Sequence, residues 1–256
     1  MTSDIGSSQP PSQPAAAPTT RTNSFARIGG ALFAPNETFK EIAAKPDFGI
    51  PLAILLIVGF ISALIIAQHV DFGAATREAL EAQGREMSAE DMEQAVRIGS
   101  AFGKAFTYFS PLISAIFFVV IAGILLLAFR MFGGEGNFKQ SFSVTLYAWF
   151  PQLIKGILMT IIIMTRKDVP ADQLANIVMS NPGFLVDPKQ QAVLHALLSS
   201  IDVFTIWTLV LFIIGFSFVS RMTKAKSAAI VVSLWIVTVI IKLGFAALGA
   251  SRMKAA

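Results

Sequence analysis

Five long apolar runs constrain the fold of this 256-residue chain more than any other feature. Crossing a hydrocarbon layer of about 30 Å takes about 20 helical residues. The runs have about that length, and together they contain only three charged residues, Lys155, Asp202 and Lys242. They cover residues 50–68, 111–129, 141–164, 198–220 and 228–249. We therefore expect an all-α polytopic membrane protein, a bundle of five transmembrane helices.

Composition supports the same fold class. Hydrophobic residues make up 54% of the chain and charged residues only 14%, which does not suit the surface of a soluble domain. A transmembrane β-barrel is excluded because it requires short segments of alternating polarity, and these are absent. The chain contains no cysteine, so disulfides, thiolate chemistry and cysteine metal sites are excluded.

The runs divide the chain into three parts. Residues 1–24 are rich in Ser, Pro, Gln, Thr and Ala and contain no apolar stretch. Such a segment cannot bury enough surface to offset the entropy of ordering, so we expect a disordered tail. Residues 25–249 form the membrane domain, and residues 250–256 form a short second tail.

Two short helices are expected before the first span. Residues 24–33 have apolar side chains at helical spacing, which suits a helix on the membrane surface, although a soluble lead-in helix fits equally well. A second helix over 37–44 is expected to bury Phe39 and Ile42. The residues expected to contact the membrane surface or a partner are Phe25, Arg27 and Ile28 in the first helix and Arg221, Lys224 and Lys226 in the turn before the last span.

Two further segments outside the spans have helical signals. Residues 71–110 are rich in acidic residues and are expected to form a helical hairpin that breaks at Gly84, with Ser88 and Asp91 making a capping box. The acidic residues suit a solvated face, and the alternative is cation binding. Farther along, a helix starting at Asp187-Pro188 is expected to run unbroken into the fourth span.

Signals for catalysis, cofactors and metals are weak. The two histidines, His69 and His195, lack the helical spacing of metal ligands, so we expect no metal site. The glycine-rich turn at 133–137 lacks the Lys-Ser/Thr ending of a phosphate-binding loop, so no nucleotide cofactor is expected. Basic residues form no single patch interleaved with aromatics, so nucleic acid is not an expected partner. We expect no enzymatic activity, because no nucleophile, base and orienting group can be assembled.

The charged residues within the spans are the best candidates for a site. A charge in the membrane costs about 3 kcal/mol on insertion scales and usually faces protein or water. We expect Lys155 and Lys242 to face the bundle interior and one of them to pair with Asp202, with Gln152 one turn from Lys155 completing a polar cluster. The alternative is that the long lysine side chains reach the headgroups on their own.

Orientation is less strongly determined. Outside the spans the basic residues divide nine and nine between the two sides of the membrane. Short, dense basic loops carry most weight in setting orientation, and the turn with Arg221, Lys224 and Lys226 is the densest. This places the amino terminus in the cytoplasm and, with five spans, the carboxyl terminus outside.

Several short motifs resemble those of the Yip domain family, the Ypt/Rab-interacting membrane proteins, in their bacterial form. They are LFAPNETF at 32–39, Lys45-Pro46 before the first span, GGEGNFKQ at 133–140 and YAWFP at 147–151. The resemblance implies five spans, a cytoplasmic amino terminus and, for a bacterial member, the inner membrane. Eukaryotic members bind prenylated Rab GTPases in vesicle traffic, but the large acidic hairpin of this chain departs from their compact loops.

Two functions remain open. The first is a membrane-organising or protein-interaction role, with the lipid bilayer and cytosolic or membrane proteins as partners, or further copies of the chain in a homo-oligomer. The second is a small transporter or lipid-translocating protein whose path is lined by the polar cluster of Lys155, Lys242, Asp202 and Gln152.

Overall fold

The structure, a computed structural model, describes residues 23–81, 87–166, 169–188 and 190–255. Residues 1–22 of the expected disordered tail and the expected break at Gly84 lie outside these ranges. The last two residues of that tail belong to the fold. Ser24 is the first residue of helix α1 (Ser24–Phe33), and the Asn23 side chain accepts a hydrogen bond from the Ala26 amide at 2.8 Å.

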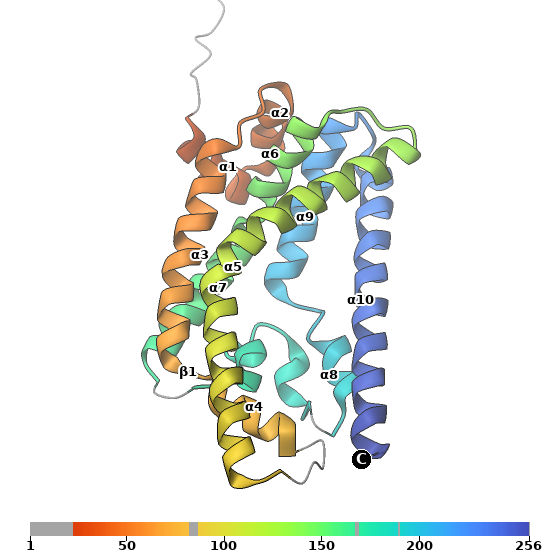
Figure 1. The fold of residues 1–256 in the computed structure, drawn as a ribbon. Coiled ribbons are helices and arrows are strands. Elements are labelled where there is room, and N and C mark those ends of the chain that lie inside the picture. Colours follow the sequence, from red (N-terminus) through yellow and green to blue (C-terminus); the bar gives the residue numbers. More distant parts are fainter. Residues whose placement is uncertain (1–22, 82–86, 167–168, 189, 256) are drawn as a thin grey trace, which may run out of the picture.

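The expected all-α membrane bundle is confirmed (Figure 1). Within the described residues, four helical segments are long and apolar enough to cross a membrane, and a helix pair bent by 50° is the fifth if it forms one span. The four are α3 (Gly49–His69), α5 (Ala89–Met131), α6 (Phe138–Ala148) together with α7 (Phe150–Met164), and α10 (Lys224–Ala255); the bent pair is α8 (Ala192–Leu198) with α9 (Val203–Val219).

The remaining elements cover the two ends of the bundle (Figure 1). Helix α1 and helix α2 (Pro35–Ala44) lie at the end where α6 begins and where α9 turns into α10. The opposite end carries α4 (Phe72–Glu81), the 3-10 helices η1 (Ala171–Asn176) and η2 (Pro182–Leu185), and the strands β1 (Val70–Asp71) and β2 (Val169–Pro170), which pair in parallel with Val70 opposite Val169. The carboxyl-terminal end of α10 lies at this second end, so the chain enters and leaves the bundle at opposite ends.

The core lies where α2, α5, α6 and α9 meet. Phe39 of α2 and Tyr147 of α6 have no exposed surface, and the rings of Phe129 and Phe216 stack with their centroids 4.8 Å apart. Burial of Phe39 and Ile42 confirms the prediction for the second short helix. Since burying each large side chain contributes about 1.5–3 kcal/mol, α2 is an integral part of the bundle.

Helix α1 is also docked on the bundle by one face, and its contact with the membrane surface stays a prediction. Ile28 and Leu32 pack against both parts of the core, and Ala31 is fully buried. Phe25 and Phe33 are exposed over 63% and 82% of their surface, although the Phe33 ring touches Trp207 of α9 at a centroid distance of 6.5 Å. One face of α1 therefore packs on protein and the other is free to contact lipid.

Helix α5 combines the second arm of the expected hairpin with the second span. It has 43 residues and is about 64 Å long at about 1.5 Å per residue, so it extends well beyond a hydrocarbon layer. Ser88 caps its start by accepting the Asp91 amide at 3.1 Å. The Asp91 carboxylate accepts from the Ser88 hydroxyl at 2.6 Å, so the expected capping box is only half formed.

The expected third span, 141–164, consists of two helices. The Asn137 and Gln140 side chains form a capping box that begins α6 at Phe138. The helix is interrupted at Trp149, because Pro151 has no N–H to donate to the carbonyl of Tyr147. The amino-terminal half of this span, helix α6, is the more buried half, and every residue from Ser141 to Ala148 lies inside the bundle.

The expectation of a helix that starts at Asp187-Pro188 and runs unbroken into the fourth span is wrong, because α8 starts only at Ala192. Helix α8 ends at Leu198, and α9 begins at Val203 after a bend of 50°. Asp202 is therefore the residue that caps α9 and does not lie inside a helix. The break places a polar segment, residues 199–202, at membrane depth.

Candidate functional site

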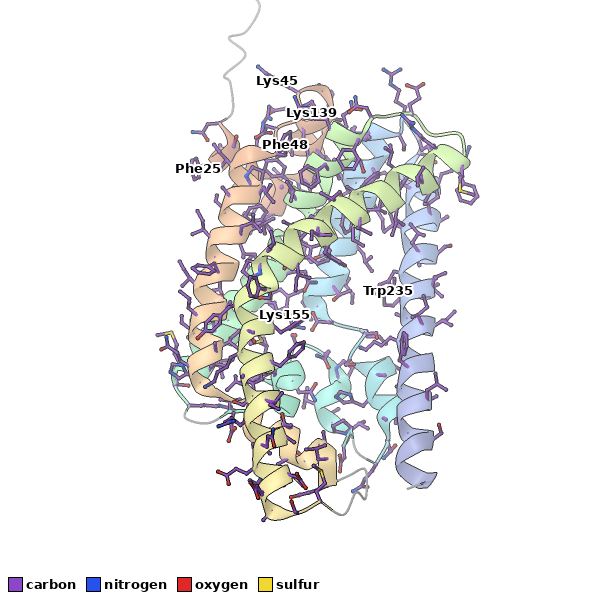
Figure 2. The ribbon with its side chains drawn as sticks, viewed as in Figure 1. Phe25, Lys45, Phe48, Lys139, Lys155 and Trp235 are labelled. Carbon is purple, nitrogen blue, oxygen red and sulfur yellow. The ribbon has the colours of Figure 1, made fainter. Side chains whose placement is uncertain are left out.

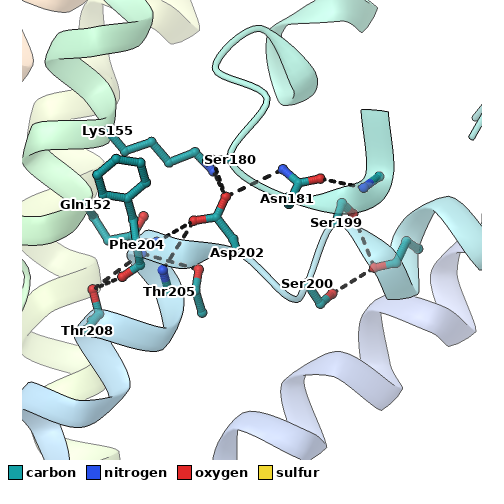
Figure 3. Close-up of polar contacts among 12 residues, drawn as sticks. Gln152, Lys155, Ser180, Asn181, Ser199, Ser200, Asp202, Phe204, Thr205 and Thr208 are labelled. Atoms are coloured by element: carbon teal, nitrogen blue, oxygen red, sulfur yellow. Dashed lines mark hydrogen bonds and ion pairs between the residues drawn. The ribbon is translucent and has the colours of Figure 1, made fainter. Parts of the chain in front are cut away.

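Asp202 lies at the centre of a polar cluster inside the bundle (Figure 3). Its side chain is 1% exposed. Its Oδ2 atom is 2.8 Å from Lys155 Nζ of α7, accepts a hydrogen bond from the Ser180 hydroxyl and lies 3.5 Å from Asn181 Nδ2. The segment before η2 and helix α7 therefore meet at this carboxylate.

The other oxygen of Asp202 determines where α9 starts. Its Oδ1 atom accepts hydrogen bonds from the amides of Phe204 at 2.9 Å and Thr205 at 3.2 Å. These amides belong to the first turn of the helix, whose N–H groups have no partner within the helix. A carboxylate at this position also interacts favourably with the helix dipole. Asp202 thus terminates the break and pairs with Lys155 at the same time.

Gln152 extends the cluster along α9. Its Nε2 atom is 3.3 Å from the Thr205 hydroxyl and 3.4 Å from the Thr208 hydroxyl. No hydrogen bond joins Gln152 to Asp202 among the described residues. Thr205 links the two, because its amide donates to Asp202, so Gln152 belongs to one cluster with Lys155 and Asp202 (Figure 3).

Lys242 is joined to the same break from the other side. Its Nζ atom on α10 donates to the hydroxyls of Ser199 at 2.8 Å and Ser200 at 3.1 Å. Among the described residues it has no carboxylate partner, and the residue is exposed. Lys242 therefore fixes α10 to the break, whereas Asp202 pairs with Lys155.

Both carboxylate oxygens of Asp202 are already paired within the cluster. A cavity of about 180 Å³ reaches Gln152 between α3, α5 and α7, but neither Lys155 nor Asp202 lines it. No group of three potential metal ligands from His, Asp and Glu lies together in the described part of the chain. His69 bonds to its own helix at the Ile65 carbonyl, and His195 bonds to Asn176. The contacts of the cluster join α7, the start of α9 and the segment before η2.

A second polar cluster, which the sequence did not reveal, lies at the end formed by α1 and α2. Arg27 was expected at the surface, but it is buried. Its Nη1 atom donates to Asp47 Oδ1 at 2.6 Å and to the Lys45 carbonyl at 3.0 Å. The signal in the sequence was Asp47, an acidic residue directly after Lys45-Pro46. Its partner Arg27 is 20 residues away in the chain, so local spacing could not reveal the pair.

Asp47 connects three segments of the chain. Its Oδ2 atom accepts hydrogen bonds from the Ser24 hydroxyl at 2.6 Å and from the Tyr147 hydroxyl of α6 at 2.7 Å. Burial by itself raises the pKa of Asp47, but hydrogen bonds from Ser24, Tyr147 and Arg27 and the charge of Arg27 outweigh it, so the pKa is lower than its ordinary value. The ionised carboxylate therefore holds α1 and the start of α3 to α6.

We expect the stability of the protein to fall in acid because of Asp47. Since the pKa of Asp47 is lowered on folding, its contribution is fully present above the ordinary value of 3.8 and is lost as the pH falls through the lower folded value. The Asp47→Asn variant should lower the free energy of unfolding by about 1–3 kcal/mol at neutral pH. Unfolding midpoints of the two proteins should converge below pH 3.8. A constant difference at every pH would contradict the role of the ionised carboxylate.

The basic turn before α10 packs beside two other segments. Arg221 forms an ion pair with Glu135 of the glycine-rich turn at 3.1 Å, and Lys224 Nζ donates to Asn36 Oδ1 of α2 at 2.6 Å. The side chain of Lys226 has no such partner among the described residues. Of the residues expected to contact a membrane or a partner, Phe25, Arg221, Lys224 and Lys226 are exposed, Ile28 is partly buried and Arg27 is buried.

These segments together form a surface that we call the basic face. It contains seven exposed basic residues and only three exposed acidic ones, Glu37, Glu41 and Glu135. At the opposite end of the bundle the described exposed residues are four basic and seven acidic. Figure 2 shows Lys45 and Lys139 at the end where Phe25 and Phe48 also lie. The basic residues are Lys40, Lys45, Arg130, Lys139, Arg221, Lys224 and Lys226.

Comparison with known proteins identifies the family. No curated protein and no solved structure matches the chain. The family model of the Yip1 domain matches residues 29–246, which include α2, the polar cluster around Asp202 and every span up to the last turns of α10. The chain therefore belongs to the Yip1 domain family.

Proposed function

We propose that this protein is a non-catalytic membrane-organising or protein-interaction protein that binds its partners through the basic face. The observation that carries the proposal is the face itself: three segments far apart in the sequence meet to expose seven basic residues at one end. A basic face attracts an acidic partner, which raises the rate of association and disfavours partners of the wrong charge.

Side-chain contacts join the segments of the basic face, which favours recognition over a solvating role. Contacts between its segments include Lys224 with Asn36 and Arg221 with Glu135. Beneath it, Phe39 and Ile42 are fully buried in the core. A preformed surface loses less conformational entropy when a partner binds.

The intramembrane cluster supports the same proposal and disfavours the transporter alternative. A transport path needs polar groups that exchange partners with a substrate. Asp202 instead accepts from Lys155, Ser180 and two backbone amides, and it is almost fully buried. We propose that the cluster stabilises the broken fourth span, and we assign the protein no catalytic activity.

The charge asymmetry also favours one orientation. We propose that the basic face lies in the cytoplasm and the carboxyl terminus outside, since short loops next to spans retain basic residues on the cytoplasmic side. The seven exposed basic residues of this face are opposed by an end that is acidic in the described residues. With the resemblance to bacterial Yip proteins, we propose the inner membrane of a bacterium as its location.

Charge reversal on the basic face tests the proposed function. The triple variant Lys40→Glu, Lys45→Glu and Lys139→Glu changes exposed residues that make no side-chain ion pair among the described residues. Proteins near the basic face can be identified by proximity labelling in intact cells. We expect the yield of these partners to fall about tenfold, because the charges that steer association change sign.

The matched control makes the same charge change at the opposite end. It combines Arg97→Glu, Lys104→Glu and Arg166→Glu, all exposed. This variant should retain the wild-type partners. An identical partner set in all three proteins would contradict the proposal, as would substrate flux in proteoliposomes that is lost in a Lys155→Met variant.

A further inference from the structure

A groove of about 520 Å³ runs between the end of α5 and the first half of α10. Its walls are apolar apart from Lys226 and Ser233. Phe132 and Val237 in its lining are 69% and 51% exposed, so protein covers little of it. Other lining residues include Ala128, Ala229 and Leu234. A groove of this kind opens to the hydrocarbon layer when the bundle is in a membrane.

The groove has a charged end and an apolar end. Lys226, Ala229, Ser233 and Val237 follow one another along one face of α10. Val237 is eleven positions after Lys226, or about 16 Å along the helix. The apolar run of α10 begins two residues after Lys226, so the ammonium group lies at headgroup level and the rest of the groove lies in the hydrocarbon layer.

The charged end has no acidic side chain beside Lys226 among the described residues. Lys226 has no carboxylate partner among the described residues, and its neighbours Arg221 and Lys224 use their side chains elsewhere. The first turn of α10 contains no acidic residue, although the positive end of a helix dipole favours one. A phosphate beside Lys226 would supply the missing negative charge.

We propose that this groove binds one anionic phospholipid, with its phosphate at Lys226 and an acyl chain along Ala229, Ser233 and Val237. Basic pockets between transmembrane helices are suited to anionic headgroups. A second copy of the chain fits less well, because a two-fold contact through the groove brings two copies of Lys226 together without a carboxylate. The site opens to lipid and does not depend on the proposed function of the basic face.

Lipid retention by the purified protein tests the site. The protein is reconstituted in nanodiscs containing equal amounts of phosphatidylglycerol and phosphatidylcholine, and bound lipid is counted by native mass spectrometry after release. We expect one phosphatidylglycerol to be retained preferentially. Lys226→Gln should lower this preference about fivefold, the factor that loss of one lysine at a membrane surface carries. Ala229→Phe should lower retention by filling the groove beside the chain.

Two controls separate the groove from general effects of charge and size. Lys139→Gln removes the same charge from the same end outside the groove, and Ala225→Phe adds the same ring to an exposed residue of α10 that does not line it. Both should retain phosphatidylglycerol as the wild type does. Equal retention of the two lipids by the wild type would overturn the site. An equal loss of phosphatidylglycerol retention in Lys139→Gln would also overturn it. So would a lipid-free dimer that is disrupted only when Ala229 is replaced, because a second copy of the chain would then occupy the groove.

Discussion

The Asp202→Asn variant is expected to lose about 3–5 kcal/mol of stability, because removing one partner of a buried ion pair leaves the other charge uncompensated. Lys155 Nζ is 2.8 Å from the carboxylate, and the side chain of Asp202 is 1% exposed. Asparagine keeps an oxygen for the amides of Phe204 and Thr205, so the loss reports mainly the missing charge. The unfolding midpoint in nanodiscs, followed by tryptophan fluorescence, measures the effect.

A double variant separates the ion pair from the rest of the cluster. Lys155→Gln combined with Asp202→Asn should be more stable than Asp202→Asn alone, since no unpaired charge remains. Exchanging the two residues should not restore stability, because a lysine at 202 has no acceptor for the helix amides and the hydroxyl of Ser180. The exposed control Glu93→Gln should leave the midpoint unchanged. Wild-type stability of Asp202→Asn would rule out the pair as a structural element.

Gly215→Ala is the second substitution expected to have a large effect. Gly215 lies on α9 where this helix crosses α6 and α2, and a Cβ atom there would be 2.4 Å from Val144 Cγ1 and 3.0 Å from a ring carbon of Phe39. Both neighbours are fully buried and cannot move freely. Overpacking of this kind costs about 1–3 kcal/mol. Thermal unfolding in the same nanodiscs should show a lower midpoint.

Two further variants test this explanation. Gly244→Ala places the same methyl group on α10, where no atom lies within 4 Å of the new Cβ. It should be neutral or raise stability by up to about 1 kcal/mol, because alanine favours a helix over glycine. Adding Val144→Ala to Gly215→Ala should recover part of the loss by removing the clashing methyl groups. If Gly215→Ala and Gly244→Ala behave alike, close packing of α9 is not the cause.

The sequence predicted much of the intramembrane cluster but not which lysine would pair. Lys155 and Lys242 both fall within spans, and both were equally available to Asp202. Lys155 pairs because α7 and α9 pack together beside the break, whereas α10 approaches from the side of Ser199 and Ser200. A helix position gives the depth of a charge but not its direction around the bundle axis. That direction is a property of packing.

The break at residues 199–202 was missed although its signal was present. An aspartate directly before an apolar run is a common helix start, and Asp202 precedes Val203 in this way. Hydropathy averages over such a residue, so the span appeared continuous. The same averaging concealed the interruption at Trp149, where Pro151 was visible in the sequence.

Residues far apart in the chain account for the contacts that the sequence could not reveal. Arg27 and Asp47 are 20 residues apart, and Tyr147 is 100 residues from Asp47. Their contact requires α1 and α2 to fold back onto α6. Sequence patterns report local periodicity, so an arginine on a short amphipathic helix appeared to be a surface residue, whereas it is buried in an ion pair.

The sequence by itself determined that the chain is a membrane bundle, because lipid offers no hydrogen bonds and an apolar run of about 20 residues must form a helix there. It also determined the family through short motifs that the Yip1 domain match bears out. Only the tertiary structure decided that a break ending at Asp202 separates α8 from α9, that Arg27 is buried, and that three separate segments form one basic face. These features depend on how helices pack around one another, which local sequence does not specify.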